Sequence, residues 1–402
     1  MHMFFWGVAA RVSTDRDKIH EVLNRSVVEV IPSRDSLEQM LRAGKPLRIK
    51  LGIDPTSPHL HIGRAVTLLK LRDFQDLGHT IVFIVGDFTG LIGDTSDKET
   101  ERPMLRKDVV EKNKQKYFEQ AGKILDVAKV ELHYNSEWLA KLGYRDVGEH
   151  ADQFSVSDFI SRELIRKRLD DGSRVSLREL LYPLMQGYDS VAVKADVEIG
   201  GTDQRFNLLA GRTLQTHYAQ TPQHVLITGP LLPGTDGRKM SSSWGNTINL
   251  DDTPDAMFGK VMSLPDSLIE PYFTHATRVP LPRITEIIAG HPKEAKMALA
   301  EEIVRMYHSA LVAGKARATF ERTFSKGEAP DDAPTVVLSG QSFADALVAS
   351  GIVSSKTDFR RLIDAGAISV VSNGEKITYA RQPKSGEIIR VGKHRFVKIA
   401  AE

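Results

Sequence analysis

The chain contains no cysteine, so disulfide bonds and thiolate metal sites are excluded. It also lacks an apolar run of the ~20 residues that a membrane-spanning helix requires. The apolar residues 1–10 have no Lys or Arg ahead of them, and charged residues follow at once. We therefore interpret this stretch as a loose extension rather than a signal peptide, and we expect a cytoplasmic protein without a membrane contact.

The chain has little net charge, +2 from 54 basic and 52 acidic residues, so no strong overall field marks a binder of polyanions. The charge is uneven, however, because residues from Ser339 onward include 10 Lys or Arg against 6 Asp or Glu. This basic end is a modest indication of an RNA or DNA contact, and a solvated basic face is the alternative. The length of 402 residues predicts two or three domains.

The stretch from Leu51 to Thr67 joins the end of a buried strand to the start of a helix through a polar turn. A helix N-terminus offers backbone N–H groups and a positive dipole end to an anion. Asp54, Thr56 and two histidines place several polar side chains in this turn, which favours a phosphate site. An ordinary turn with a helix cap is the alternative interpretation.

Two βαβ patterns predict a parallel sheet built in halves. The first has a strand ending at Ile53, a helix from His61 to about Leu77 and a strand at Thr80–Val85. The second comprises Val197–Gly200, Gln204–Gln215 and His224–Thr228. Ligands of such sheets bind beyond the carboxyl ends of the strands, so the segment Asp87–Asp94 is a further candidate for the site.

The remaining segments complete an α/β fold of the Rossmann type. A flexible, basic loop at Leu232–Asn246 is able to close over a phosphate site, or is simply a surface linker. The predicted segments are an N-terminal helical extension (1–45), a Rossmann-type parallel-sheet catalytic domain (46–246) with a helical insertion at about 95–180, an all-helical domain (247–325), a linker (326–340) and a small α+β domain (341–402).

The last of these segments has two short predicted helices and three strands. Basic residues gather on the second helix and on the later strands, which suits contacts to the backbone of folded RNA. The candidate RNA-binding residues are Lys356, Arg360, Arg361 and Lys393.

Four segments of the chain occur together, in the same order and at the same spacing, in one known family. His61–Arg64 matches its HIGH-type motif except at Arg64, and Lys239–Ser243 matches its KMSKS-type loop except at Ser242. The segments Tyr182–Asp189 and Gly201–Gln204 match its blocks for the amino acid and the ribose. The chain resembles bacterial tyrosyl-tRNA synthetases, which are class I aminoacyl-tRNA synthetases with a C-terminal S4 RNA-binding domain, over nearly everything after about residue 24.

This resemblance implies an ATP-dependent tyrosine–tRNA ligase that uses ATP with Mg²⁺, L-tyrosine and tRNA(Tyr), forms a homodimer through the insertion and has no metal site of its own. His61 and Thr56 would donate to the phosphates, and Lys239 would reach the leaving pyrophosphate, as the catalytic residues. The residues that the resemblance implies for ATP are Gly52, Asp54, His61, Gly63, Arg64, Thr67, Gly201, Asp203, Lys239, Ser241 and Ser242.

Recognition of tyrosine requires a buried partner for its hydroxyl, because such a site is left with unpaired polar groups when phenylalanine enters. Tyrosyl enzymes are themselves the standard example of this effect. By resemblance Asp189 takes the phenol hydroxyl; the alternative is that Tyr182 and Asp189 are ordinary helix-surface or capping residues. The residues implied for the amino and carboxylate groups are Asp94, Tyr182, Gln186 and Gln204.

Three departures from the family pattern concern charge. Arg64 replaces an imidazole with a longer, forked cation, and Ser242 replaces a lysine, so more weight rests on Lys239. Lys50 stands where some tyrosyl enzymes carry a tyrosine that binds the substrate hydroxyl. The competing interpretations are a tryptophanyl enzyme, an RNA-binding protein with a vestigial site, and a small-molecule adenylyltransferase.

Overall fold

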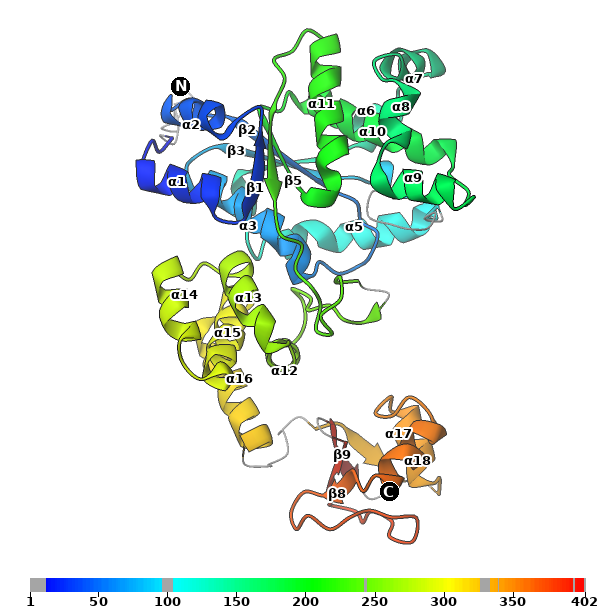
Figure 1. Ribbon diagram of the computed structural model, residues 1–402. Coiled ribbons are helices and arrows are strands. Elements are labelled where there is room, and N and C mark those ends of the chain that lie inside the picture. The colour runs from blue at the N-terminus through cyan, green and yellow to red at the C-terminus, as the bar shows by residue number, and fades with distance from the viewer. Residues whose placement is uncertain are drawn as a thin grey trace, which may run out of the picture. The chain divides into compact units, whose positions relative to one another are not determined.

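The structure is a computed structural model of the chain, with two compact units, Met1–Ser309 and Ala310–Glu402 (Figure 1). It describes residues 12–95, 104–241, 244–325, 333–338, 340–392 and 395–400.

The first unit is built on a six-stranded sheet in the order β1-β6-β5-β2-β3-β4. The strands are β1 (Val27–Ile31), β2 (Arg48–Ile53), β3 (Thr80–Val85), β4 (Val130–Tyr134), β5 (Val197–Gly201) and β6 (His224–Thr228). All neighbours run parallel except β1, which is antiparallel to β6. The chain leaves β2 toward β3 on one side and β5 toward β6 on the other, so the topological switch point lies between β2 and β5.

The two predicted βαβ units are confirmed. In the first, α3 (Ile62–Asp76) connects β2 to β3, and in the second, α11 (Arg205–His217) connects β5 to β6. Both helices pack on the strands of the sheet (Figure 1). The interior strand β3 reads TIVFIV and is buried at all but its first residue, because helices cover a parallel sheet on both faces.

The prediction of a helical extension at residues 1–45 was wrong at 27–31, and its first 11 residues lie outside the described residues. Helices α1 (Arg16–Asn24) and α2 (Arg34–Arg42) flank the strand β1, which extends the sheet. Ser26 has φ +57° and so ends the helical path, and the β-branched sequence VVEVI then suits a strand.

The predicted helical insertion at about 95–180 also contains a strand, because β4 pairs with β3 at the sheet edge. This strand is only partly buried, and its sequence VELHY has no continuous apolar run of the kind that marks a buried strand. The helices of this region are α4 (Thr89–Ile92), α5 (Lys107–Ala121), α6 (Ser136–Leu139), α7 (Tyr144–Ala151), α8 (Val156–Ile160), α9 (Glu163–Asp170) and α10 (Leu177–Val193).

Four helices follow the sheet within the first unit. They are α12 (Pro254–Met262), α13 (Ile269–Ala276), α14 (Leu281–Ile288) and α15 (Pro292–Tyr307). The helix α13 contacts α3, so the helical part and the sheet part of this unit share a packed boundary. The next helix, α16 (Ala310–Phe320), falls in the second unit, earlier than the predicted domain boundary at residue 325.

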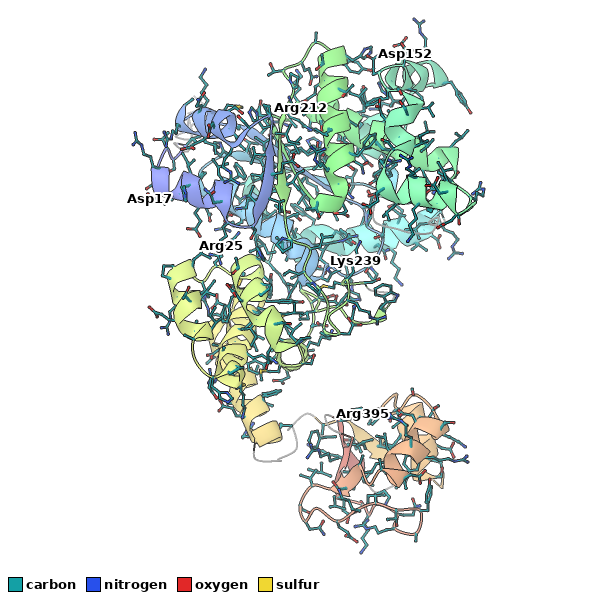
Figure 2. All side chains as sticks on the ribbon, in the orientation of Figure 1. Asp17, Arg25, Asp152, Arg212, Lys239 and Arg395 are labelled. Carbon is teal, nitrogen blue, oxygen red and sulfur yellow. The ribbon has the colours of Figure 1, made fainter. Side chains whose placement is uncertain are left out.

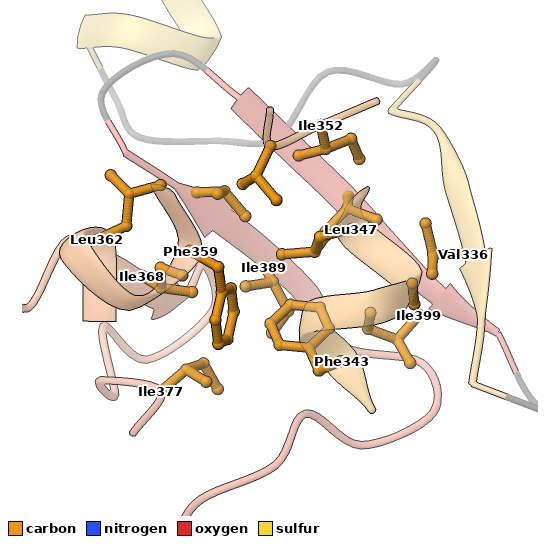
Figure 3. Close-up of a cluster of buried hydrophobic side chains, with 14 of the residues drawn as sticks. Val336, Phe343, Leu347, Ile352, Phe359, Leu362, Ile368, Ile377, Ile389 and Ile399 are labelled. Atoms are coloured by element: carbon orange, nitrogen blue, oxygen red, sulfur yellow. The ribbon is translucent and has the colours of Figure 1, made fainter. Parts of the chain in front are cut away.

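The second unit ends in a small four-stranded module in the order β7-β10-β9-β8. Its elements are β7 (Thr335–Val337), α17 (Phe343–Ala349), α18 (Lys356–Asp364), β8 (Ile368–Val370), β9 (Ile388–Val391) and β10 (Arg395–Ala400). Phe343 of α17 and Phe359 of α18 meet in its core, with Ile389 near both rings (Figure 3). The strand β7 pairs with β10, so the module begins inside the predicted linker 326–340 rather than at residue 341.

In the part of the chain that the structure describes, the helices are all too short or too polar to cross a membrane.

Candidate active site

A cavity of about 380 Å³ lies at the carboxyl ends of β2 and β5, at the switch point of the sheet. The turn before α3, the helix α10, the start of α11 and the loop after β6 supply its walls. The predicted residues that line it are Gly52, Asp54, Thr56, His61, Gly63, Arg64, Thr67, Asp94, Tyr182, Gln186, Gly201, Asp203, Gln204, Lys239 and Ser241. Residues almost 190 positions apart in sequence thus share one space.

His61 lies at the N-cap of α3 and faces this cavity. Its Nδ1 is buried and has no hydrogen-bond partner among the described residues. Burial, together with the positive charges of Arg64 and Lys239, lowers the pKa of His61 to about 3, so the imidazole is neutral near pH 7. A Cβ on Gly63 would lie 3.0 Å from Nδ1, so the glycine leaves room for the ring.

Arg64 holds the turn through its guanidinium group. Nη1 donates to the Asp54 carbonyl and the Tyr117 hydroxyl, and Nη2 donates to Thr56 Oγ1, each at 3.2 Å. A hydroxyl that accepts a hydrogen bond keeps its own proton, so Thr56 remains able to donate into the cavity. Thr67, one turn into α3, donates its hydroxyl to the Arg64 carbonyl at 2.8 Å.

Lys239 reaches the cavity from the loop that follows β6 (Figure 2). Asn246, which is buried, organises this loop. Its Nδ2 donates to the Lys239 carbonyl at 3.0 Å and to Asp236 at 2.8 Å, and its Oδ1 accepts from the Ser241 amide at 2.8 Å. The loop is therefore a defined turn that presents a cation, not an extended linker. Ser242 lies outside the described residues.

Asp54 connects the end of β2 to two other elements. Its carboxylate accepts from Thr89 of α4 at 2.7 Å and from the Tyr182 hydroxyl of α10 at 2.9 Å. Burial raises the pKa of Asp54 to about 6, against the effect of these hydrogen bonds, and burial also raises the pKa of Tyr182. A Cβ on Gly86 would lie 2.1 Å from Asp54 Oδ1, so only glycine permits this arrangement.

The amide of Gln204 is oriented by its neighbours at the start of α11. Its Nε2 donates to Asp94 at 2.7 Å, and its Oε1 accepts from Asn207 at 3.0 Å. Two carboxylates, Asp94 and Asp203, line the same wall of the cavity. This end of the cavity therefore favours a ligand with a positive amino group or with hydroxyl donors.

Asp189 is not among the described residues that line the cavity. It is buried behind the wall, where Trp138 Nε1 donates to Oδ1 at 2.7 Å and Asn135 Nδ2 donates to Oδ2 at 3.2 Å. Burial raises the pKa of Asp189 to about 7. Lys50 is fully buried as well and pairs with Glu198 at 2.8 Å, so it does not supply the second contact to a phenol hydroxyl.

Sequence reasoning missed several residues of this site. His59, one of the two histidines of the polar turn, lines the cavity and pairs with Asp251 at 2.6 Å. Leu231 and Met240 add apolar surface to it. No spacing rule marks these residues, because they enter the cavity from loops that the tertiary fold brings together.

Within the described ranges, no group of three or more His, Asp or Glu side chains is arranged to hold a metal ion. The cavity lining includes a neutral imidazole with two cations near it, Arg64 and Lys239, and also a carboxylate and an amide that bond to each other, Asp94 and Gln204. Such a site suits a ligand that carries phosphates at one end and an amino group at the other.

Three of the four candidate RNA-binding residues, Lys356, Arg360 and Arg361, lie on α18 of the C-terminal module. Lys356 and Arg360 line a cavity of about 290 Å³ beside Tyr379, whose side chain is more than half exposed. Arg361 pairs with Asp358 at 2.8 Å. Lys393 lies outside the described residues.

Comparison with known proteins places the chain in one family. Residues 42–325 match the family of class I tRNA synthetases described as "W and Y". The chain is 44% identical over 403 residues to a protein named tyrosine–tRNA ligase from Carboxydothermus hydrogenoformans, with 95% of this chain and 97% of that one covered. A protein of the same name from Thermotoga maritima is 44% identical over 391 residues, with 94% and 96% covered.

Solved structures share the fold of the first unit. A C-terminally truncated mitochondrial tyrosyl-tRNA synthetase from Aspergillus nidulans superimposes with a TM-score of 0.64 at 22% identity, over 76% of this chain and 94% of that one. The tyrosyl-tRNA synthetase from Archaeoglobus fulgidus, complexed with L-tyrosine, gives 0.59 at 22% identity, over 75% and 99%.

Proposed function

The chain belongs to the class I tRNA synthetases for tryptophan and tyrosine, and on this premise we propose that it activates L-tyrosine with ATP and transfers the tyrosyl group to tRNA(Tyr). The observation that carries the proposal is the cavity that His61 and Lys239 line together with Asp94 and Gln204. The curated relatives cover nearly the whole chain and carry the tyrosine–tRNA ligase name.

The reaction has two steps. The tyrosine carboxylate attacks the α-phosphorus of ATP, the bond to the bridging oxygen breaks, and tyrosyl-adenylate and pyrophosphate form. A hydroxyl of the 3′-terminal adenosine of tRNA then attacks the tyrosyl carbonyl and releases AMP. Neither step requires a covalent bond to the protein, so catalysis rests on positioning and on stabilising charge.

The phosphate end of the cavity is suited to the first step. A neutral His61 donates one hydrogen bond to a phosphate oxygen, and Thr56, held by Arg64, donates another. Lys239 neutralises the charge that develops on the leaving pyrophosphate. Mg²⁺ enters as part of the ATP substrate, with the phosphates as its main ligands. The nucleoside part lies along Gly52, Gly63 and Thr67 and reaches Gly201 and Asp203.

The other end of the cavity holds the amino acid. Asp94, Gln204 and Gln186 surround the α-ammonium group, since carboxylate and amide oxygens are its natural acceptors. Asp189 recognises the phenol hydroxyl from behind the wall, once the ligand and the α10 side chains adjust to each other. Tyrosine, rather than tryptophan, is the substrate that such a buried carboxylate selects.

The C-terminal module binds tRNA through the exposed face of α18. Lys356 and Arg360 contact phosphates, and Tyr379 offers an exposed ring on which an unpaired base can stack. Arg361 extends the same basic surface. The net positive charge of this end of the chain supports the assignment. Because tRNA is charged for translation, we expect the reaction to take place in the cytoplasm.

A second copy of the chain covers an apolar face formed by the helices of the insertion. Tyr144, Val156 and Leu177 lie on α7, α8 and α10, and their side chains are 99%, 71% and 78% exposed. Large apolar side chains exposed to this extent over neighbouring helices are typical of an interface. The functional molecule is therefore a homodimer.

Pyrophosphate exchange with a panel of amino acids tests the proposed function. We expect tyrosine alone to stimulate the exchange of labelled pyrophosphate into ATP, and tRNA(Tyr) to become charged when it is added. Exchange stimulated by tryptophan but not by tyrosine would overturn the substrate assignment. Binding of tRNA without any exchange would indicate an RNA-binding protein with an inactive site.

A further inference from the structure

Behind the tyrosine end of the cavity, Lys50 and Glu198 form an ion pair that is buried on every side. They are direct neighbours across β2 and β5, with a Lys50 Nζ to Glu198 Oε1 distance of 2.8 Å and exposed side-chain fractions of 0% and 1%. A buried ion pair of this kind adds little to stability, because the cost of removing both charges from water offsets their attraction. Its position beside the substrate pocket therefore calls for another explanation.

The pair is attached to α10 at two points one helical turn apart. Lys50 Nζ donates to the Gln186 carbonyl at 3.0 Å and to Ser190 Oγ at 2.8 Å, so its three protons have three acceptors. Glu198 accepts from Ser190 Oγ at 2.8 Å. Asp189 lies within the turn that is fixed in this way.

Glu198 also determines the orientation of Gln186, which lines the cavity. The Gln186 Nε2 donates to Glu198 Oε1 at 3.3 Å, and a carboxylate accepts only the amino end of an amide. The carbonyl end of Gln186 is then the end that a substrate ammonium group can use. Gln223 donates to the other carboxylate oxygen and completes the network.

The adjoining helix is shaped around this network. A Cβ added to Gly211 of α11 would lie 2.5 Å from Gln223 Nε2 and 2.9 Å from Ser190 Oγ. A larger residue at this position would therefore displace the side chains of Gln223 and Ser190. The backbone of α11 therefore approaches α10 as closely as the buried polar groups require.

We propose that the buried Lys50–Glu198 pair is a positioning and specificity element of the tyrosine site, which holds Gln186 and Asp189 of α10 in the arrangement that distinguishes tyrosine from phenylalanine. The inference rests on the proposed function. It explains the lysine as a group that acts through α10 and does not touch the substrate.

The charges around Asp189 determine the direction in which its pKa should move when either member of the pair is replaced. Asp189 faces Lys50 on β2, Glu198 on β5, Tyr182 on its own helix, and the neutral donors Asn135 and Trp138. Lys50 favours the ionised carboxylate and Glu198 opposes it. Loss of the lysine should therefore raise the pKa of Asp189, and loss of the glutamate charge should lower it.

The test compares Lys50→Met, Glu198→Gln and the double variant with the parent chain in tyrosine-dependent pyrophosphate exchange from pH 5.5 to 9. We expect the acidic limb of kcat/KM for tyrosine to move upward by about one pH unit in Lys50→Met and downward in Glu198→Gln. We also expect the ratio of kcat/KM for tyrosine over phenylalanine to fall about tenfold or more in Lys50→Met and in the double variant.

Lys70→Met is the matched control. Lys70 is equally buried, bonds to the Val22 carbonyl at 2.8 Å and to Asp73 at 3.0 Å, and is not part of the cavity. Its loss should leave both the amino acid ratio and the acidic limb unchanged, whatever it does to thermal stability. If Lys50→Met does not fold, the downward shift in Glu198→Gln decides the question.

The proposal would be overturned if the acidic limbs stayed in place or moved in the same direction in both single variants. It would also be overturned if the tyrosine-over-phenylalanine ratio of kcat/KM in the double variant stayed within twofold of the parent. A parent chain that shows no tyrosine-dependent exchange would instead overturn the proposed function. The two failures are therefore distinguishable.

Discussion

The hydroxyl of Tyr182 donates a 2.9 Å hydrogen bond to Oδ2 of Asp54, and this bond joins the middle of α10 to the end of β2 beside the cavity. Thr89 donates to the other oxygen at 2.7 Å. Asp54 is partly buried, and burial raises the pKa of its carboxyl group to about 6, so these two donors do not compensate for the loss of water. A poorly solvated carboxylate lowers the free energy of unfolding, and its place in the candidate site indicates that it is kept there for function.

Asp54→Asn should therefore stabilise the folded chain at pH 8. The folded-state pKa of about 6 lies above the ordinary value of 3.8, so the buried carboxylate costs free energy of folding wherever it is ionised. The cost is small below about pH 4, grows as the pH rises from about 4 to about 6, and levels off above that at about 3 kcal/mol. We expect a gain of about 1–3 kcal/mol at pH 8 and none at pH 4, measured by urea unfolding.

The same substitution at Asp170, which is exposed at the end of α9, serves as its control and should change stability by less than about 0.5 kcal/mol at either pH. A loss of stability in Asp54→Asn at pH 8 would show that the hydrogen bonds outweigh desolvation.

Lys239→Ala should lower kcat/KM for ATP in pyrophosphate exchange by about 10²–10³-fold, because the leaving pyrophosphate loses a charged donor. The KM for tyrosine should change little, since the proposed ligands of the amino acid are Asp94, Gln186 and Gln204 rather than Lys239. Lys45→Ala, which removes an exposed lysine before β2, is the comparison and should leave exchange unchanged. Full activity in Lys239→Ala would refute the catalytic role.

His61 should act as a neutral donor across the working pH range. Its pKa of about 3 lies below the ordinary value of 6.5, so protonation of His61 cannot produce an acidic limb between pH 5 and 7. His61→Asn should keep more kcat for exchange than His61→Ala, because an amide still donates a hydrogen bond. A limb near pH 6.5 that vanishes in His61→Asn would contradict this assignment.

Removing residues 326–402 should weaken tRNA charging by about tenfold or more and leave tyrosine-dependent exchange nearly intact, because the active-site cavity lies wholly in the first unit. A cut at residue 341 would be a poorer design, since it leaves β7 without its partner β10. Equal loss of both activities would argue against this division of labour.

Replacing Leu177 with glutamate should shift the chain from dimer to monomer in sedimentation velocity, because a charge would be buried against the partner. Leu281→Glu provides the comparison: Leu281 on α14 is 49% exposed and lies outside the insertion, so its replacement should not change the molecular mass. A parent chain that sediments as a monomer would remove the proposed interface.

The sequence by itself determined the parallel sheet, the family and most of the cavity wall. Short-range physics explains this success, because β2, the polar turn and α3 form one contiguous unit whose apolar pattern and helix start are local features. Motif spacing then indicated Tyr182, Gln204 and Lys239 as members of one site. The same local reasoning failed at β1 and β4, whose short or half-polar sequences become strands only through their pairing with β6 and β3.

Only the tertiary structure decided what the buried charges do. Lys50 and Glu198 are 148 residues apart and meet because β2 and β5 are neighbours at the switch point of the sheet. The family motif marks Asp189 as a ligand of the substrate. Its burial and its hydrogen bonds to Asn135 and Trp138, however, depend on how α6 and α10 pack. Burial and the directions of hydrogen bonds arise from long-range packing, and no residue pattern along the chain encodes them separately.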